Sequence, residues 1–254
     1  GGVFLNMIMN MKIQQRFGDK LNLFFNPISN DHGNAIGAIL EQYYQETGKN
    51  PVSPYMSLYL GSSYSDEEIL LSANRFNFKI KKVNKVDTAI DLIERGKVIG
   101  WFQGRSEFGP RGLGNRSILA LATDQKYKDI VNEKVKKRES WRPFCPTIIE
   151  EKSNEFLKNP VYAPYMILGF EMKNPELYPA VAHVDGTTRP QILKKDVNPD
   201  FYEVVKGVGG IILNTSFNLA GDPIVETPHD AFMTLKNSEM DAIIINDFMV
   251  EKNK

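Results

Sequence analysis

The chain has 254 residues, 42% of them hydrophobic, enough for the core of one large domain or of one domain and part of another. Lysine plus arginine and aspartate plus glutamate each number 31, and this formal net charge of zero argues against an extended basic surface for nucleic acid or membranes. The single cysteine excludes an internal disulfide and is compatible with a reducing, cytoplasmic compartment. No apolar run approaches the ~20 residues of a membrane span, and no secretory signal is visible.

Residues 1–48 are expected to form a small unit that cannot close its own core. The unit opens on two glycines without a methionine, so we expect it to be a remnant of a larger domain. Gly48 is placed to end its last helix. The elements predicted in chain order are a strand at 3–5, a helix through Met11, a strand at 21–27, a loop at 29–33 and a helix at 34–47.

Residues 49–64 are rich in glycine, serine and proline and are predicted to link this unit to a larger domain over residues 65–254. Ser65 and Glu68 form a capping box, and Asp87 is expected to cap the next helix, which ends at Gly96. Helices and strands then mix with short connections, which predicts the α/β or α+β class around a twisted mixed sheet. The further elements expected are strands at 97–102, 117–121, 209–214 and 241–246, a helix at 125–137 and a helix from Thr227.

The segment GRSEFGPRGLGNRS, residues 104–117, places three arginines in a glycine-rich loop after a predicted strand. Glycine lets a backbone approach an anion closely, and arginine offers a planar fork that fits phosphate or carboxylate oxygens. A solvated loop with surface arginines is the alternative, and spacing alone does not separate the two. We expect Arg105 and Arg116 to brace the loop, with Glu107 as a partner.

A second basic segment, residues 132–146, crowds Lys136, Arg138 and Arg142 around the end of a predicted helix. A solvated basic face is the ordinary explanation of such a run. The aromatic and proline residues among the charges, however, favour arginines that are fixed by packing. Cys145 has no obvious histidine partner, so a packed thiol is favoured over a nucleophile.

Two further segments carry polar groups at predicted strand ends. Arg189 follows a turn in HVDGTTRPQ and opens a short strand, and His183 there is more typical of a satisfied core histidine than of a catalytic base. The other segment, residues 213–228, gathers asparagine, serine and threonine that can cradle an oxyanion or satisfy their own backbone. Three basic segments and one Asn/Ser loop together predict a confined site for a small, phosphate-bearing anion. No P-loop and no Cys/His zinc set is present.

The motifs GRSEFGPRGLGNRSIL, VKKRESWRPFCP, HVDGTTRPQ and NTSFNLAGDPIVETPHDA resemble, in this order, the C-terminal half of the NodU/CmcH-type O-carbamoyltransferases. The opening unit resembles the end of that family's N-terminal domain, which has the actin-like ATPase fold. The resemblance implies a YrdC-like domain that binds carbamoyl phosphate and ATP and forms carbamoyl-adenylate. It also implies that the actin-like domain passes the carbamoyl group to an acceptor hydroxyl, helped by a divalent metal such as iron.

Motif position then implies roles for particular residues. The cations that would hold the phosphates and the carbamoyl group are Arg111, Lys136, Arg142 and Arg189. The residues that would complete the pocket are Arg138, Asn214, Ser216 and Asn218. The turn that would contact nucleotide in the first domain holds Gly1, Gly2 and Asn6. Asp31 matches a metal-binding carboxylate whose histidine partners lie upstream. Gly112 and Cys145 stand where many relatives have alanine.

Two alternatives stay open. One is an adenylate synthase for tRNA modification that uses threonine and bicarbonate, and the other is a YrdC-like module that binds double-stranded RNA, which the net charge of zero disfavours. The expected partners are carbamoyl phosphate, ATP, a small-molecule or sugar acceptor, and the first domain of the same chain. A homodimer is compatible with the sequence, and the sequence does not name the acceptor.

Overall fold

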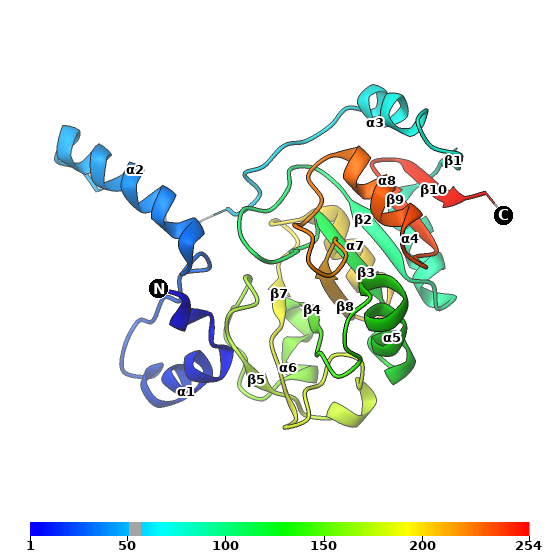
Figure 1. Ribbon diagram of the computed structural model, residues 1–254. Helices are drawn as coiled ribbons and strands as arrows, with labels where there is room; N and C mark the ends of the chain where they lie inside the picture. The colour runs from blue at the N-terminus through cyan, green and yellow to red at the C-terminus, as the bar shows by residue number, and fades with distance from the viewer. Residues whose placement is uncertain (51–56, 254) are drawn as a thin grey trace.

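The computed structural model describes residues 1–50 and 57–253, and the larger part is built on one eight-stranded mixed sheet (Figure 1). The strand order is β1-β10-β9-β2-β3-β8-β4-β7, and the pairs β2–β9 and β4–β7 are parallel while the other neighbours are antiparallel. The predicted α/β class with a mixed sheet is therefore confirmed. The strands are β1 (Phe78–Lys82), β2 (Ile99–Phe102), β3 (Arg116–Ala120), β4 (Cys145–Ile149), β7 (Gln191–Leu193), β8 (Ile211–Ser216), β9 (Ala242–Ile245) and β10 (Phe248–Lys252).

Helices cover both faces of this sheet, because neighbouring strand residues alternate between two apolar cores. Along β3, Ile118 packs in one core and Leu119 in the other. The core around Ile118 is covered by α3 (Asp66–Ala73), α8 (Pro228–Lys236) and α5 (Gln125–Asp129), which continues as a π-helix, η2 (Ile130–Lys136). The core around Leu119 is covered by α4 (Lys85–Glu94) and α7 (Pro199–Gly207).

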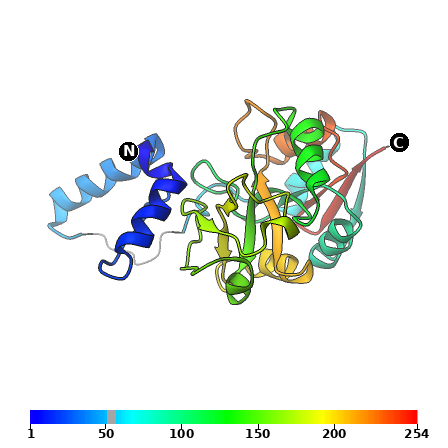
Figure 2. The same ribbon diagram turned by 90° about the horizontal axis from the view of Figure 1, so that it is seen from below.

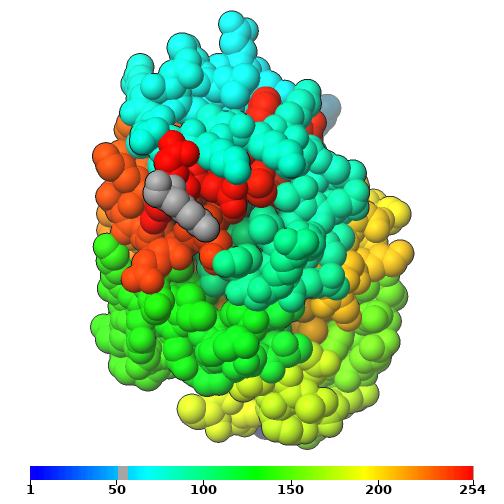
Figure 3. Space-filling view, turned by 90° about the vertical axis from the view of Figure 1, so that its right-hand side faces the viewer, coloured from blue at the N-terminus to red at the C-terminus, as the bar shows by residue number. Residues whose placement is uncertain are grey.

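Shorter elements complete the larger part. A two-stranded sheet joins β5 (Phe170–Glu171) to β6 (Thr187–Thr188) beyond the β7 edge, as Figure 1 shows. Seen from the side, the red β10 lies between cyan and orange segments, in agreement with its place next to β1 (Figure 3). The remaining short helices are η3 (Glu150–Lys152), α6 (Ser153–Phe156) and η4 (Pro175–Leu177).

The N-terminal unit lies to one side of the sheet and is entirely helical or irregular (Figures 1 and 2). It holds η1 (Gly2–Leu5), α1 (Met7–Phe17) and α2 (Asp31–Thr47). The predicted strand at 3–5 is wrong, because those residues form the 3-10 helix. The predicted strand at 21–27 is also wrong: within residues 1–50 and 57–253 no strand pairs with it, and Leu21 and Phe24 are exposed.

Helix ends agree with the sequence signals in most places. The Ser65/Glu68 capping box is present, Thr227 caps α8, and Gly48 ends α2 in the left-handed conformation at φ 64°. Two starts differ. Residue 31 already begins α2, inside the predicted loop. The cap of α4 is Asn84, whose Oδ1 accepts from the N–H groups of residues 86 and 87 at 3.1 and 3.3 Å, so the predicted cap Asp87 lies in the first turn instead.

Residues 57–64 of the predicted linker pack against the larger part. Leu58 is buried, and its carbonyl accepts from the N–H of Phe108 at 2.6 Å. The Tyr59 hydroxyl donates to the carbonyl of Leu113 at 2.9 Å. The domain boundaries stay a prediction, and residues 51–56 of the linker lie outside the described residues.

Candidate functional site

The glycine-rich loop joins the antiparallel strands β2 and β3 and is organised by one buried carboxylate. Oε1 of Glu107 accepts hydrogen bonds from the N–H groups of Leu113 at 2.6 Å, Asn115 at 2.8 Å and Arg116 at 3.3 Å. Burial raises the pKa of Glu107, because desolvation disfavours its charged form. The loop is therefore held in one shape by its own glutamate.

Two of the loop's arginines brace it, as expected, but their side-chain partners are carbonyl oxygens rather than Glu107. Arg105 donates to the carbonyls of Leu60 at 2.7 Å and Gly61 at 2.8 Å. Arg116 is fully buried, donates to the carbonyl of Gln103 at 2.8 Å, and lies 3.5 Å from the centroid of the Phe102 ring. Both side chains therefore hold the loop through backbone carbonyl oxygens.

The loop glycines have a structural reason that needs no bound anion. A Cβ at Gly112 would lie 2.7 Å from the carbonyl oxygen of Arg116 and 3.0 Å from Cα of Ser216. Gly114 has φ 104°, and a Cβ there would clash with the Phe201 ring. Only glycine lets the loop pack this closely, and the contact of Gly112 with Ser216 brings Arg111 beside the end of β8.

Lys136 lies at the end of the π-helix and is buried among neutral oxygens. Its Nζ donates to the Ser216 carbonyl and to Asn218 Oδ1, both at 2.5 Å, and to Ser216 Oγ at 3.1 Å. Within the part of the chain that the structure describes, no carboxylate forms an ion pair with it. Burial lowers the pKa of Lys136, and the charge of Arg138 lowers it further. A bound anion would favour the charged form of this lysine again, so the surroundings of Lys136 favour anion binding.

A cavity of about 320 Å³ opens over Lys136 and is lined by the cations that the sequence places in this segment. Arg138 donates from Nε to Oδ1 of Asn132 at 2.8 Å and lies 4.7 Å from the Phe144 ring centroid, so packing does fix this arginine. Arg142 is half-exposed and pairs with Glu139 at 2.9 Å. The residues named by sequence that line the cavity are Lys136, Arg138, Arg142, Ser216 and Asn218.

Arg111 and Arg189 form an adjoining pair around the only cysteine. The Arg189 guanidinium donates from Nε and Nη2 to Sγ of Cys145 at 3.3 and 3.2 Å. Arg111 keeps a buried Nε without a hydrogen-bond partner, and burial followed by the charge of Arg189 lowers its pKa to about 10. Two cations held this close are stabilised by an anion between them. Cys145 is a packed thiol, as predicted.

Asn214 lies in β8 opposite Cys145 of β4. Its Nδ2 donates to Oγ1 of Thr147 at 2.9 Å and to Oε1 of Gln191 at 3.4 Å. The side chain is fully buried, and its Oδ1 has no partner within the described chain. It therefore sits in the sheet beside the arginine pair and does not line the cavity over Lys136.

The residues assigned to the first domain lie in the N-terminal unit, apart from the cavity (Figure 1). Asn6 caps α1, and its Oδ1 accepts from the N–H groups of residues 8 and 9, both at 3.1 Å. Gly1 and Gly2 are exposed, and Asp31 is the exposed first residue of α2. Across residues 1–50 and 57–253 no three His, Cys, Asp or Glu side chains are grouped to hold a metal, so these residues alone do not fit one.

Asn132 is a site residue that sequence reasoning missed. It is fully buried, and its Nδ2 donates to the carbonyls of Ser140 at 3.0 Å and Arg142 at 2.9 Å. It thereby shapes the turn that carries the cavity's arginines. No sequence signal marks it, because an asparagine in a helix is ordinarily a solvated residue.

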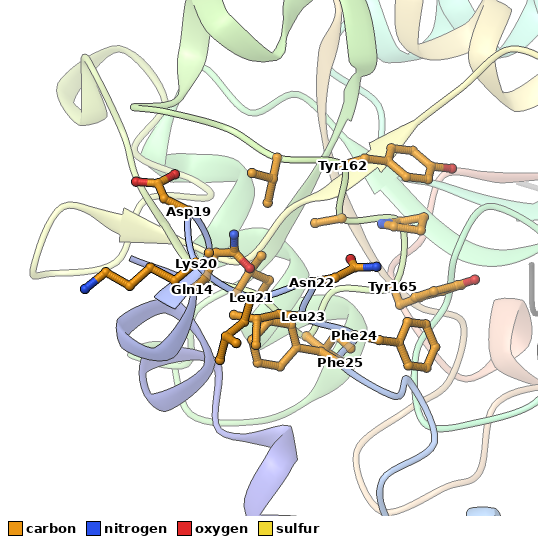
Figure 4. A pocket seen from close by; sticks show the side chains of 16 residues that line it. Gln14, Asp19, Lys20, Leu21, Asn22, Leu23, Phe24, Phe25, Tyr162 and Tyr165 are labelled. Atoms are coloured by element: carbon orange, nitrogen blue, oxygen red, sulfur yellow. The ribbon is translucent and has the colours of Figure 1, made fainter. Parts of the chain in front are cut away.

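A larger cavity of about 600 Å³ lies between residues 14–25 and 161–168, away from these cations (Figure 4). Figure 4 shows its wall of leucine, phenylalanine and tyrosine side chains, with Lys20 as its one lysine or arginine. Its single cation and the carboxylate of Asp19 do not offer the clustered positive charge that suits a phosphate. Among the described residues, each helix is too short or too polar to span a bilayer.

The fold and these residues define an α/β protein with two clusters of cationic side chains. The model of the family "Carbamoyltransferase C-terminus" matches residues 90–252, more than half of the chain, and the chain belongs to this family. The nodulation protein NolNO of Sinorhizobium fredii is 37% identical over 99% of this chain and 39% of its own length. A 3'-hydroxymethylcephem-O-carbamoyltransferase of Streptomyces clavuligerus is 29% identical over 97% of this chain and 47% of its own length.

The chain thus spans about half the length, or less, of the curated relatives it matches. Among solved structures, full-length HypF in the phosphate- and nucleotide-bound form aligns over 69% of this chain and 23% of that chain, with TM-score 0.49 and 14% identity. The HypF of T. kodakarensis aligns over 68% and 22%, with TM-score 0.47 and 15% identity.

Proposed function

We propose that this chain binds carbamoyl phosphate and ATP at the cation clusters and forms carbamoyl-adenylate, from which the carbamoyl group passes to an acceptor hydroxyl. The observation that carries the proposal is Lys136, a buried ammonium whose partners are all neutral oxygens. Family membership supports carbamoyl transfer, and one relative is by name an O-carbamoyltransferase.

The proposed chemistry has two steps, and each releases a charged leaving group, first phosphate and then pyrophosphate. Water takes carbamoyl phosphate to carbamate and inorganic phosphate, and a carbamate oxygen then attacks the α-phosphorus of ATP and expels pyrophosphate. Negative charge spreads over the phosphoryl oxygens in such steps, so fixed cations and positioning supply the catalysis without a protein nucleophile. The absence of any role for Cys145 as a nucleophile agrees with its packing against Arg189.

Roles follow from position. Lys136, Arg138 and Arg142 bind phosphoryl oxygens in the cavity, with Ser216 and Asn218 orienting the Lys136 ammonium. Arg111 and Arg189 bind the second anionic group. Transfer to the acceptor hydroxyl belongs to this proposal only together with residues outside this chain. The same holds for nucleotide binding by Gly1, Gly2 and Asn6 and for a metal at Asp31.

A lysine pair on the same π-helix tests the proposal. Lys136→Met keeps the length and burial of the side chain but removes the ammonium, so we expect pyrophosphate release that depends on carbamoyl phosphate to fall about 100-fold or more. Lys134→Met is the matched control, because Lys134 is exposed, pairs with Glu239 at 3.4 Å and does not line the cavity. Steady-state pyrophosphate release is the measurement, with the unfolding midpoint as a check of folding.

The same assay separates the substrate classes. Pyrophosphate release with threonine and bicarbonate, but not with carbamoyl phosphate, would favour the tRNA-modification reading instead. Unchanged turnover in Lys136→Met would contradict the site itself.

A further inference from the structure

The two tryptophans of the chain have opposite environments. Trp101 is fully buried, and its indole N–H donates to the carbonyl of Gly114 at 2.9 Å. Trp141 is 70% exposed. Single exposed apolar side chains are common on protein surfaces, so the surroundings of Trp141 matter more than its exposure. Nothing in the roles assigned above uses Trp141.

Trp141 lies in the turn between two residues that line the basic cavity. Glu139 and Arg142 both line the cavity, and the Arg142 guanidinium carbon lies 6.0 Å from the centroid of the indole ring. A planar surface is therefore placed directly beside the groups proposed to bind phosphates.

The turn that presents this indole is fixed rather than loose. Asn132 donates to the carbonyls of Ser140 at 3.0 Å and Arg142 at 2.9 Å, on either side of Trp141. The N–H of Arg142 also donates to the carbonyl of Glu139 at 3.3 Å. The backbone is thus anchored on both sides of the tryptophan, which lowers the entropy cost of using its ring as a contact surface.

We infer that Trp141 is the stacking platform for the adenine base of ATP, while the phosphates occupy the cavity. The inference rests on the proposed function. Of the two proposed substrates only ATP has a flat ring, and it joins that ring to phosphates in one molecule. An aromatic side chain beside a cationic groove is the general arrangement by which proteins hold a base and its phosphates together. When ATP binds, its phosphates replace the Glu139 carboxylate as the partner of Arg142, which now pairs with Glu139 at 2.9 Å.

Two variants distinguish a stack from a charge effect. Trp141→Leu removes the aromatic face, and Trp141→Phe keeps a smaller one. Titration calorimetry with ATP, tripolyphosphate and carbamoyl phosphate is the measurement. We expect Trp141→Leu to bind ATP about 10- to 100-fold more weakly, the range for loss of a base–aromatic stack, and Trp141→Phe to recover most of that loss. Affinities for tripolyphosphate and carbamoyl phosphate should not change in either variant.

Fluorescence of the wild-type protein gives an independent readout. ATP should quench the indole emission, tripolyphosphate should not, and the quench should disappear in Trp141→Leu, because Trp101 is buried. Both variants should fold normally, since the replaced side chain is mostly exposed.

The outcomes against the inference are distinct from those against the proposed function. Equal ATP affinity in wild type and Trp141→Leu, or an equal loss for ATP and tripolyphosphate, overturns the stacking role while leaving the carbamoyl phosphate site intact. If the wild-type protein binds neither ATP nor carbamoyl phosphate, the proposed function fails and this inference fails with it.

Discussion

At the scale of single residues, two buried ionisable groups are accommodated in different ways. Oε1 of Glu107 accepts hydrogen bonds from three N–H groups of its own loop, whereas its Oε2 has no partner within the described residues. The Nζ of Lys136 has only neutral acceptors. A buried ionisable group without a counter-ion costs stability, and such a cost is typical of a group kept for a ligand. Glu107 therefore organises its own loop, and Lys136 is the residue that we propose for the ligand.

Glu107→Ala tests the structural assignment. Three N–H groups lose their acceptor, so we expect the free energy of unfolding to fall by about 3 kcal/mol at about pH 4. Burial raises the folded-state pKa of Glu107 above its unfolded value, so the stability it adds is full below the unfolded pKa and is lost as pH rises through the folded pKa. The difference in the free energy of unfolding between the wild-type protein and Glu107→Ala should therefore become smaller toward pH 8. Urea unfolding at several pH values measures it, with the exposed Glu94→Ala as a control within about 0.5 kcal/mol.

If the free energy of unfolding of Glu107→Ala instead falls further below that of the wild-type protein as pH rises, the charged form of Glu107 is the stabilising one.

The residue types in the sequence indicated which chemical groups gather at the candidate site better than they indicated how those groups are arranged. The cations and the Asn/Ser loop were predicted to converge, and Lys136, Ser216 and Asn218 do meet. The separation into a cavity and an arginine pair was not predictable, because it depends on the packing of Gly112 against Ser216 in a different strand. The shaping role of Asn132 was missed for the same reason, since its partners lie in a turn that the sequence does not define.

At the scale of elements, continuous apolar runs were predicted well, and strands that contain proline or many charged residues were not. The expected strands at 97–102, 117–121, 209–214 and 241–246 became β2, β3, β8 and β9. The missed β4 begins Cys145-Pro146, and a proline ordinarily argues against a strand interior. The apolar run at 21–27 has the composition of a strand, but a strand also needs a neighbour, and sequence alone does not reveal whether one is present.

Two glycines with nearly equal φ angles allow the cost of backbone strain to be measured apart from the cost of overpacking. Gly114 has φ 104° and Gly209 has φ 100°, but only a Cβ at Gly114 would meet another residue, Phe201. We expect Gly209→Ala to cost about 1 kcal/mol from backbone strain, and Gly114→Ala to cost about 3 kcal/mol because overpacking is added. Chemical unfolding of both variants is the measurement. Equal losses would show that Phe201 moves aside freely and that close loop packing is not the reason for the glycine.

At the scale of the whole molecule, the N-terminal unit and the sheet share few contacts. Ile28 packs with Leu58, Leu113 and Cys145, and Nδ2 of Asn10 donates to the carbonyl of Ile167 at 2.8 Å. In contrast, α2 has no buried residue, and several large apolar side chains of residues 1–47 are exposed. The larger part should accordingly be stable by itself, provided it keeps the residues just before α3.

Two truncated proteins test where that larger part begins. The protein of residues 57–254 keeps Leu58 and the carbonyls that Arg105 and Arg116 use. It loses the burial of Ile28, the packing of Phe25 and the hydrogen bond from Asn10 to Ile167, so we expect it to be less stable by about 4 kcal/mol. The protein of residues 65–254 also loses Leu58 and those carbonyls and should be less stable by about a further 4 kcal/mol. Urea unfolding compares them. Equal stability of the two would support the predicted boundary at residue 65.

The order of strands in the sheet has a consequence for the growing chain on the ribosome. β9 and β10 are translated after every other strand, yet they lie between β1 and β2. Until β10 emerges, β1 has no hydrogen-bonded neighbour, and one edge of β2 is also open. At ordinary elongation rates this interval lasts roughly 10 to 30 s, long compared with collapse. The nascent chain therefore exposes two unpaired, aggregation-prone strand edges until late in translation. The yield of folded protein in cells should depend on chaperones that shield these edges.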